Sequence, residues 1–420
     1  MCREMKDTGI EWIGEINNEW SIIKIAKLAQ FINGYAFNGE DLTIENEIPV
    51  IRIGDIQEGG VNLEGCLKYK KDEKLYPYSI QSKDVLIAMS GATTGKTAFI
   101  NEVDSVAYIN QRVGIIRNSK YSKYINYNLN TGEFKKYIDL IADGSAQPNI
   151  STKRIMNYYL ALPNKGLDNI INYLDEKVSK IDNIISKQKS LIEKYKAYKQ
   201  SIITETVTKG LNKNVPMKDS GIEWIGEIPS HWNIEKGKHI LNLLSRQVNE
   251  EDEVITCFRD GEVTLRSNRR EEGFTFADKE IGYQGIEPGD LVIHGMDGFA
   301  GAIGISDSRG KASPVLNVCD TKENKRYIMY YLRRLAYNNV FLALATGIRV
   351  RSCDLRWNKI GNLLYPIPPK DEQDIIVDYL DNKIIKIDNL VQIKQDYVDK
   401  LEEYKKSLIY ECVTGKREVN

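Results

Sequence analysis

The sequence MKDTGIEWIGEI at residues 5–16 returns as MKDSGIEWIGEI at residues 217–228, and the two copies differ only where Thr8 is replaced by Ser220. A tryptophan follows each copy, as Trp20 and Trp232. Chance does not produce so long a match. Solenoid repeats have periods of about 20 to 50 residues. A repeat separated by this much sequence therefore indicates two duplicated half-molecules.

A second repeated segment lies later in each half. NYLDEKVSKIDNII, beginning at Asn172, matches DYLDNKIIKIDNLV, beginning at Asp378. The continuation SIITETVT at Ser201 matches SLIYECVT at Ser407. The sequences between the motifs, residues 21–163 and 233–369, show little similarity beyond Gly-rich turns. The duplication therefore consists of a shared frame that holds two different inserts.

The shared segment after each insert has apolar residues at alternating spacings of three and four, which is typical of a coiled-coil helix. Neither segment contains Pro or Gly before Gly210 and Gly415, so each predicts a helix of about 40 residues, roughly 60 Å long. We expect the two helices to pack as an antiparallel coiled coil, with ordinary core helices as the alternative. The predicted pairing residues are Ile171, Leu174, Val178, Ile181, Ile185, Val377, Leu380, Ile384, Ile387 and Val391.

The inserts contain short β-branched runs between turns, such as KDVLIAMSG at residues 83–91 and GDLVIHG at residues 289–295. Each insert then becomes helical. The predicted fold class is α+β: two strand-rich mixed α/β domains joined by two long helices packed as an antiparallel coiled coil, with internal pseudo-two-fold symmetry. The predicted domains are 1–163 and 211–369 for the two strand-rich domains, 164–210 for a central helical region and 370–420 for a distal helical region.

The composition is that of an ordinary globular protein of two or three domains, with 420 residues, 42% hydrophobic and 28% charged. The formal net charge of -1 does not favour nucleic-acid binding by itself. No run of about 18 apolar residues occurs, and the start lacks an apolar signal segment, so we expect a cytoplasmic protein. The six cysteines form no CxxC pair, which argues against a disulfide framework or a zinc site.

Motifs for catalysis are weak. Gly95, Lys96 and Thr97 resemble part of a phosphate-binding loop, but only three residues separate Gly91 from Gly95 where the motif needs four. The three histidines have no metal spacing, and no serine has a nucleophile context. We therefore expect no catalytic residue, no metal and no cofactor in this chain.

Basic and amide side chains gather inside the inserts. Arginine reads guanine, and asparagine or glutamine reads adenine, in the major groove of DNA, whereas lysine mostly holds phosphate. The DNA-binding candidates are Arg52, Lys96, Gln111, Arg112, Gln147, Asn149, Arg266, Arg269, Arg270, Arg309, Arg349 and Arg351.

The repeated GIEWIGEI with its following Trp, the stretches DVLIAMSGATTGK and GSAQPNIS, and the helix EQDIIVDYLDNKIIKIDNL resemble the specificity subunit of type I restriction-modification enzymes. The resemblance covers essentially the whole chain. It implies two target-recognition domains that each read one half of a bipartite double-stranded DNA site, and two helical regions that set the spacing.

The resemblance also implies partners. These are two modification subunits, which carry an S-adenosylmethionine-dependent adenine methyltransferase, and restriction subunits that cut DNA using ATP. The chain departs from the family pattern where LPNKGLDNIINYLD replaces the entry to the first helix and where LATGIRVRSCD stands in place of a GSAQPNIS-like stretch. Two other functions remain open: a coiled-coil scaffold whose inserts bind protein, and a self-sufficient restriction or modification enzyme.

Overall fold

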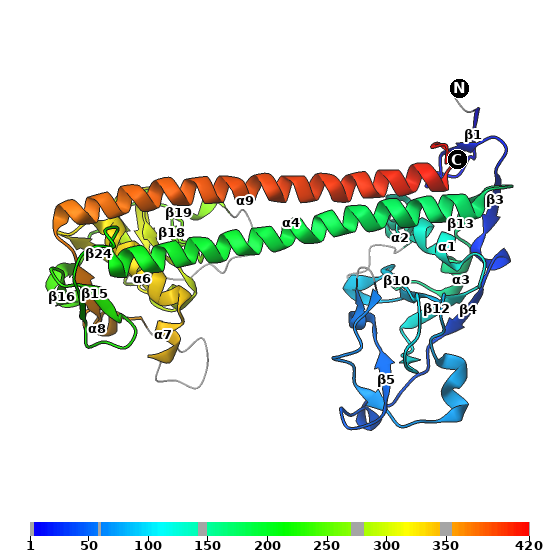
Figure 1. Ribbon diagram of the computed structural model, residues 1–420, viewed down its shortest axis with the longest axis horizontal. Helices are drawn as coiled ribbons and strands as arrows, with labels where there is room; N and C mark the ends of the chain where they lie inside the picture. Colours follow the sequence, from blue (N-terminus) through cyan, green and yellow to red (C-terminus); the bar gives the residue numbers. More distant parts are fainter. Residues whose placement is uncertain (1–3, 58–59, 142–148, 270–280, 345–354, 420) are drawn as a thin grey trace. The chain divides into compact units, whose positions relative to one another are not determined.

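The computed structural model describes residues 4–57, 60–141, 149–269, 281–344 and 355–419. The chain forms two compact units. The first comprises Met1–Lys189 and Asp396–Asn420, and the second comprises Ser190–Gln395. Both ends of the chain therefore belong to the first unit (Figure 1).

The two shared segments are long helices, as predicted. Helix α4 spans Leu167–Lys209, 43 residues, and α9 spans Lys370–Val413, 44 residues. Each ends before a glycine with positive φ, Gly210 at 69° and Gly415 at 73°, because glycine adopts this backbone conformation without strain at a helix end. Asp371 and Glu372 in the first turn of α9 favour its start by opposing the helix dipole.

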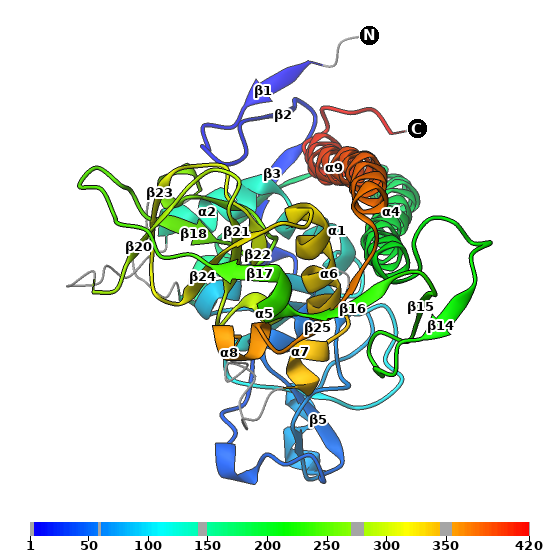
Figure 2. The same cartoon turned by 90° about the vertical axis from the view of Figure 1, so that its left-hand side faces the viewer.

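Within each unit α4 and α9 lie side by side and run antiparallel (Figures 1 and 2). In the first unit, Lys189 Nζ lies 2.9 Å from Glu402 Oε1 and Lys405 Nζ lies 2.8 Å from Asp182 Oδ1. Residue numbers thus rise along one helix as they fall along the other. In the second unit, Lys199 Nζ lies 2.7 Å from Asp388 Oδ2. The predicted packing of the two long helices is confirmed.

The apolar positions of the two helices face away from solvent. Those that are buried are Leu174, Ile181, Ile185, Val377, Leu380 and Ile387. Those that are half-buried are Ile171, Val178, Ile384 and Val391.

Each unit contains a four-stranded antiparallel sheet with the same strand order. In the first unit the order is β10-β9-β12-β4, formed by Thr97–Phe99, Val85–Ala88, Val113–Arg117 and Gln30–Asn33. In the second it is β22-β21-β24-β17, formed by Ile303–Ile305, Leu291–His294, Leu316–Thr321 and Leu241–Leu243. The two inserts differ in sequence, yet each contains its own four-stranded sheet with the same strand order.

Short strands and helices complete each unit. In the first unit they are β1 Met5–Asp7, β2 Glu15–Asn17, β3 Ser21–Lys24, β5 Ile48–Ile51, β6 Ile56–Gln57, β7 Gly60–Val61, β8 Lys68–Tyr69, β11 Tyr108–Ile109, β13 Tyr159–Leu162, α1 Ser122–Leu129, α2 Gly132–Ile141 and α3 Thr152–Met156. In the second they are β14 Met217–Asp219, β15 Glu227–Pro229, β16 Asn233–Lys236, β18 Ile255–Cys257, β19 Val263–Leu265, β20 Gln284–Ile286, β23 Gly310–Ala312, β25 Leu364–Ile367, α5 Gly237–Ile240, α6 Lys325–Tyr337, α7 Val340–Ala343 and α8 Trp357–Ile360.

The repeated N-terminal motif forms the hairpins β1–β2 and β14–β15. In each hairpin a lysine of the first strand bonds the chain that follows the second strand: Lys6 Nζ donates to Trp20 O at 2.6 Å, and Lys218 Nζ donates to Trp232 O at 2.6 Å. The first hairpin is also held to the end of α9, because Tyr410 Oη donates to Ile13 O at 3.1 Å. The lysine contact is thus the same in the two copies of the motif.

Candidate nucleic-acid interface

A polar hollow of about 420 Å³ lies in the first unit, where β9 ends and β12 begins. It brings together three of the predicted DNA-binding residues, Gln111, Arg112 and Asn149, all of which have exposed side chains. The complete lining is Asn33, Met89, Gln111, Arg112, Asn149, Ile150, Ser151, Thr152 and Arg154.

Backbone hydrogen bonds fix the positions of these side chains. Met89 N donates to Arg112 O at 2.9 Å, and Ile150 N donates to Met89 O at 2.9 Å. The loop before β12 also packs tightly against Gly34, where an added Cβ would lie 2.0 Å from Asn110 O. A larger residue at position 34 would displace the segment that carries Gln111, so this glycine is required by close backbone approach.

The side chains of this hollow carry the hydrogen-bond donors and acceptors that recognise the edges of DNA bases. Gln111 and Asn149 each carry an amide that can both donate and accept, and Arg112 carries a planar guanidinium. Thr152 Oγ1 donates to Asn33 Oδ1 at 2.6 Å on the same surface. Sequence reasoning missed Asn33, Thr152 and Arg154, because only the fold brings the end of β4 next to α3.

Two other candidates of the first unit lie outside this hollow. The Arg52 side chain is 44% exposed, and its Nε lies 3.8 Å from Asp55 Oδ2. Lys96 is exposed and immediately precedes β10. Gln147 lies outside the described residues.

In the second unit, the structure describes three of the candidate arginines, Arg266, Arg269 and Arg309, and each contacts other side chains of the protein. Arg269 Nη1 lies 2.8 Å from Asp260 Oδ2 and 2.9 Å from Glu262 Oε2, and the guanidinium lies 4.2 Å from the centre of the Phe258 ring. These carboxylates reduce the attraction of the arginine for phosphate.

Arg309 and Arg266 also have partners within the protein. Arg309 Nε lies 3.1 Å from Asp252 Oδ1, and Arg309 also pairs with Glu287. Arg266 Nε donates to Thr256 Oγ1 at 3.3 Å. Arg270, Arg349 and Arg351 lie outside the described residues.

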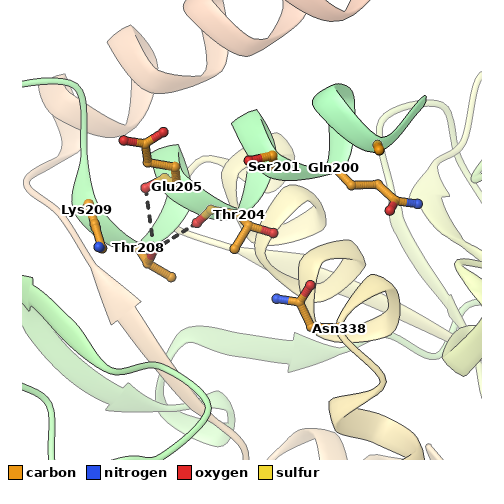
Figure 3. A pocket seen from close by; sticks show the side chains of 8 residues that line it. Gln200, Ser201, Thr204, Glu205, Thr208, Lys209 and Asn338 are labelled. Atoms are coloured by element: carbon orange, nitrogen blue, oxygen red, sulfur yellow. Dashed lines mark hydrogen bonds between the residues drawn. The ribbon is translucent and has the colours of Figure 1, made fainter. Parts of the chain in front are cut away.

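A different hollow, of about 510 Å³, lies in the second unit beside the last turns of α4 (Figure 3). Its lining is polar, and it includes Gln200, Thr204, Glu205 and Lys209 of α4 together with Asn338 at the end of α6. Thr208 Oγ1 donates to Thr204 O at 2.8 Å. One lysine beside one glutamate gives no net positive charge, so this hollow does not have the electrostatics of a phosphate-binding surface.

The titratable groups of the described residues do not form a catalytic arrangement. Burial raises the pKa of the Cys257 and Cys319 thiols to about 12 and that of Cys412 to about 11. A buried thiol with a raised pKa is a poor nucleophile. Within the part of the chain that the structure describes, no cluster of three or more His, Cys, Asp or Glu side chains could hold a metal ion. No described helix is long and apolar enough to cross a membrane.

The sheet that occurs twice with one strand order and the paired long helices define a duplicated α+β protein. Residues 17–199 match the family model of the type I restriction modification DNA specificity domain. Over these residues the chain is similar to the specificity subunits of type I restriction-modification systems.

Relatives from an archaeon and a bacterium resemble parts of the chain. The type I restriction enzyme MjaVIII specificity subunit of Methanocaldococcus jannaschii is 27% identical over 179 residues, which cover 38% of this chain and 42% of the relative. The type I restriction enzyme EcoBI specificity subunit of Escherichia coli is 23% identical over 215 residues, which cover 50% of this chain and 43% of the relative. The chain thus matches less than half the length of these relatives.

The fold resembles a solved structure from work on complex assembly and conformational transition of the type I R-M system. The TM-score is 0.67 at 13% identity, with coverage of 96% of this chain and 99% of that chain. This comparison supports the α+β fold with its two long helices.

Proposed function

We propose that the chain is the DNA-reading subunit of a type I restriction-modification complex, in which residues 1–163 and 211–369 each read one half of a bipartite site. The observation that carries this proposal is the four-stranded sheet that occurs twice with the same strand order. A duplicated reader suits a two-part site, as the symmetry of a dimer suits a palindrome. Because the inserts differ in sequence, the two half-sites differ too.

In the first unit the polar hollow supports base reading. The exposed side chains of Gln111, Arg112 and Asn149 meet there on rigid backbone. Typical recognition modules read base edges with three or four side chains. Arg52, Lys96 and Gln147 remain candidates for phosphate or base contacts, as do Arg266, Arg269, Arg270, Arg349 and Arg351 of the second insert. Arg309 pairs with Asp252 and Glu287 and is not proposed as a contact.

The helices, residues 164–210 and 370–420, are proposed to set the spacing and to bind two modification subunits. Their two flanks differ in chemistry. One flank carries the ion pairs Lys189–Glu402, Lys405–Asp182 and Lys199–Asp388. The other flank, which we term the apolar flank, exposes large apolar side chains. It consists of Ile184, Tyr397 and Tyr404 in the first unit and of Leu191, Tyr198 and Leu390 in the second.

The members of the apolar flank occupy one heptad position. Along α4 and along α9 they recur every seven residues, directly before the inward-facing residues Ile185, Ile192, Val391 and Val398. Their exposed fractions range from 36% for Leu191 to 53% for Tyr198. Exposed apolar groups in a repeated row mark a binding surface, and an amphipathic helix of a modification subunit would cover such a row.

The partners also account for the charge of the chain. A net charge of -1 gives little attraction for DNA, which carries one negative charge for about each 1.7 Å of duplex. Modification subunits that enclose the DNA would contribute the missing phosphate contacts. In this proposal the chain itself catalyses nothing, the adenine methyltransferase and the ATP-dependent nuclease belong to the modification and restriction subunits, and the complex acts on DNA in the cytoplasm.

Methylation mapping tests the proposal. Genomic DNA is sequenced for methylated adenine from cells that make the modification subunit with and without this chain. One bipartite motif should vanish when the chain is absent. Replacement of residues 21–163 by the corresponding insert of a related subunit should then change only one half of the motif. An identical methylation pattern with and without the chain, in cells whose modification subunit is active, would contradict the proposal and favour a scaffold.

A further inference from the structure

The backbone of the second unit repeats the backbone that forms the polar hollow of the first. Gly295 N donates to Val315 O at 2.8 Å, and Leu355 N donates to Gly295 O at 2.8 Å. These two bonds match those made by Met89 in the first unit. Gly295 is therefore the structural counterpart of Met89, and the equivalent surface of the second unit lies where β21 ends.

The side chains at this surface differ from those of the first unit. The match of Val315 with Arg112 also aligns Pro314 with Gln111. Neither proline nor valine has a polar side-chain atom. If the second unit reads bases at the corresponding surface, the polar contacts must come from other residues.

His294, the last residue of β21, is one such residue. Its Nδ1 accepts hydrogen bonds from Met296 N at 3.2 Å and from Asp297 N at 3.0 Å. Because Nδ1 accepts, the neutral ring carries its hydrogen on Nε2, which is left as a donor. Burial lowers the pKa of His294, so the ring is neutral at pH 7 and keeps this tautomer.

Arg259 lies beside the same turn. Its Nη2 lies 2.9 Å from Asp297 Oδ1, and its side chain is 59% exposed. One carboxylate occupies one side of the guanidinium and orients it, while the remaining N–H groups of this planar donor are available to a ligand. Met296, two residues after His294, has a 52% exposed side chain and adds an apolar group to this turn.

We infer that Arg259, His294 and Met296 read the second half of the DNA site. Arg259 donates to the O6 and N7 acceptors of a guanine, His294 Nε2–H donates to a purine N7, and Met296 contacts a thymine methyl group. This inference rests on the proposed function and assigns to it residues that the sequence alone did not single out.

Arg309, one of the six arginines of the second insert that the sequence offered as DNA-binding candidates, lies elsewhere. Arg309 pairs with Glu287, and Glu287 N donates to Asp290 Oδ2 at 2.8 Å in the turn that precedes β21. This turn is at the opposite end of the strand from His294. Arg309 is therefore a matched control: it is an exposed, carboxylate-paired arginine of the same unit, away from the inferred reading surface.

The test uses the full chain assembled with its modification subunit. Arg259→Gln, His294→Asn and Arg309→Gln are compared with the parent chain by methylation mapping and by DNA binding to the parent motif. Asparagine is chosen at position 294 because its side-chain oxygen can still accept the two backbone N–H groups. We expect Arg259→Gln to bind the parent motif roughly 10- to 100-fold more weakly. Both variants at the reading surface should relax one base pair of the second half-site and leave the first half-site unchanged.

The Arg309→Gln variant should direct methylation of the parent motif and should bind DNA with that motif as tightly as the parent chain does. The inference is overturned if Arg259→Gln and His294→Asn keep the parent motif. It is also overturned if they weaken binding equally on all sequences, because uniform loss indicates a phosphate contact or a structural role and not base reading. If the parent chain itself directs no bipartite methylation, the proposed function fails and the inference fails with it. If the parent chain directs a normal bipartite motif and the variants have no effect, the inference fails and the proposed function stands.

Discussion

At the scale of single residues, one buried tyrosine in each unit links the insert to the end of a long helix. In the first unit Tyr124 Oη donates to Ala161 O at 2.6 Å and lies 3.0 Å from Val413 O. In the second, Tyr327 Oη makes the same pair of contacts with Pro366 O and Val207 O. The same hydroxyl thus meets a strand of the insert and the end of a long helix in each unit, although the sequences around the two tyrosines differ.

Tyr327→Phe should destabilise the second unit. The hydroxyl lies 2.8 Å from Pro366 O and 3.1 Å from Val207 O, and the side chain is fully buried. Burial raises the pKa of Tyr327 well above its usual range, so the hydroxyl keeps its proton. Its loss removes the one O–H that the two buried carbonyl groups share, and an unsatisfied buried acceptor costs about 1 to 3 kcal/mol.

The measurement is urea unfolding followed by the fluorescence of the tryptophans. Tyr198→Phe is the control, because the Tyr198 side chain is 53% exposed and surface changes of this kind usually alter stability by less than about 0.5 kcal/mol. Equal unfolding midpoints for the two variants would show that the buried hydroxyl contributes nothing to stability.

Residue patterns predicted some of the candidate interface and could not predict the rest. Gln111 and Arg112 are adjacent in sequence and polar, and therefore visible as candidates. His294 was not visible as a reader, because its role depends on backbone N–H groups that fix its tautomer. An isolated histidine in sequence carries no sign of such a turn.

At the scale of elements, the long helices were predictable and the shared sheet was not. A sustained three-four spacing over many turns without Gly or Pro leaves few alternatives to a long helix. The two inserts share only a backbone pattern, in which β9 corresponds to β21 and β12 to β24. Ladder hydrogen bonds are made by main-chain groups and require only side chains that suit a buried strand. Two dissimilar sequences can therefore form sheets with the same strand order, and alignment of the two sequences does not reveal this similarity.

The apolar flank leads to a prediction about assembly. Tyr198→Asp and Leu390→Asp together place two charges where the proposed helix of a modification subunit would bind. Because both side chains are exposed, at 53% and 40%, the subunit should keep its stability and its helix content. Assembly with the modification subunit should weaken by at least about tenfold, as measured by analytical ultracentrifugation over a concentration series.

A control on the opposite flank makes the assembly test specific. Glu193→Gln and Lys196→Gln change the charges of a surface pair, Lys196 Nζ to Glu193 Oε1 at 2.9 Å, and should leave assembly as in the parent. If the variants of both flanks assemble normally, the modification subunits bind elsewhere on the chain.

At the scale of the whole molecule, the chain order and the compact units do not coincide. The first unit takes its helix partner from residues 396–420, at the far end of the sequence, and the second unit lies wholly within residues 190–395. Each long helix thus contributes one part to each unit. In the proposed function, the two readers are therefore linked by both helices, and the distance between half-sites depends on helix length rather than on either insert.

An added heptad in both helices tests this dependence. Duplication of residues 188–194 in α4 and of residues 394–400 in α9 adds seven residues to each helix and preserves the order of inward-facing positions. At 1.5 Å per residue the helices lengthen by about 10 Å, which is close to three base pairs at about 3.4 Å each. The methylated motif should keep both half-sites and gain about three base pairs between them.

A duplication in α4 alone removes the matching partner positions on α9 and should abolish methylation. An unchanged spacer in the doubly lengthened protein would show that the inserts, and not the helices, determine the distance between the two half-sites.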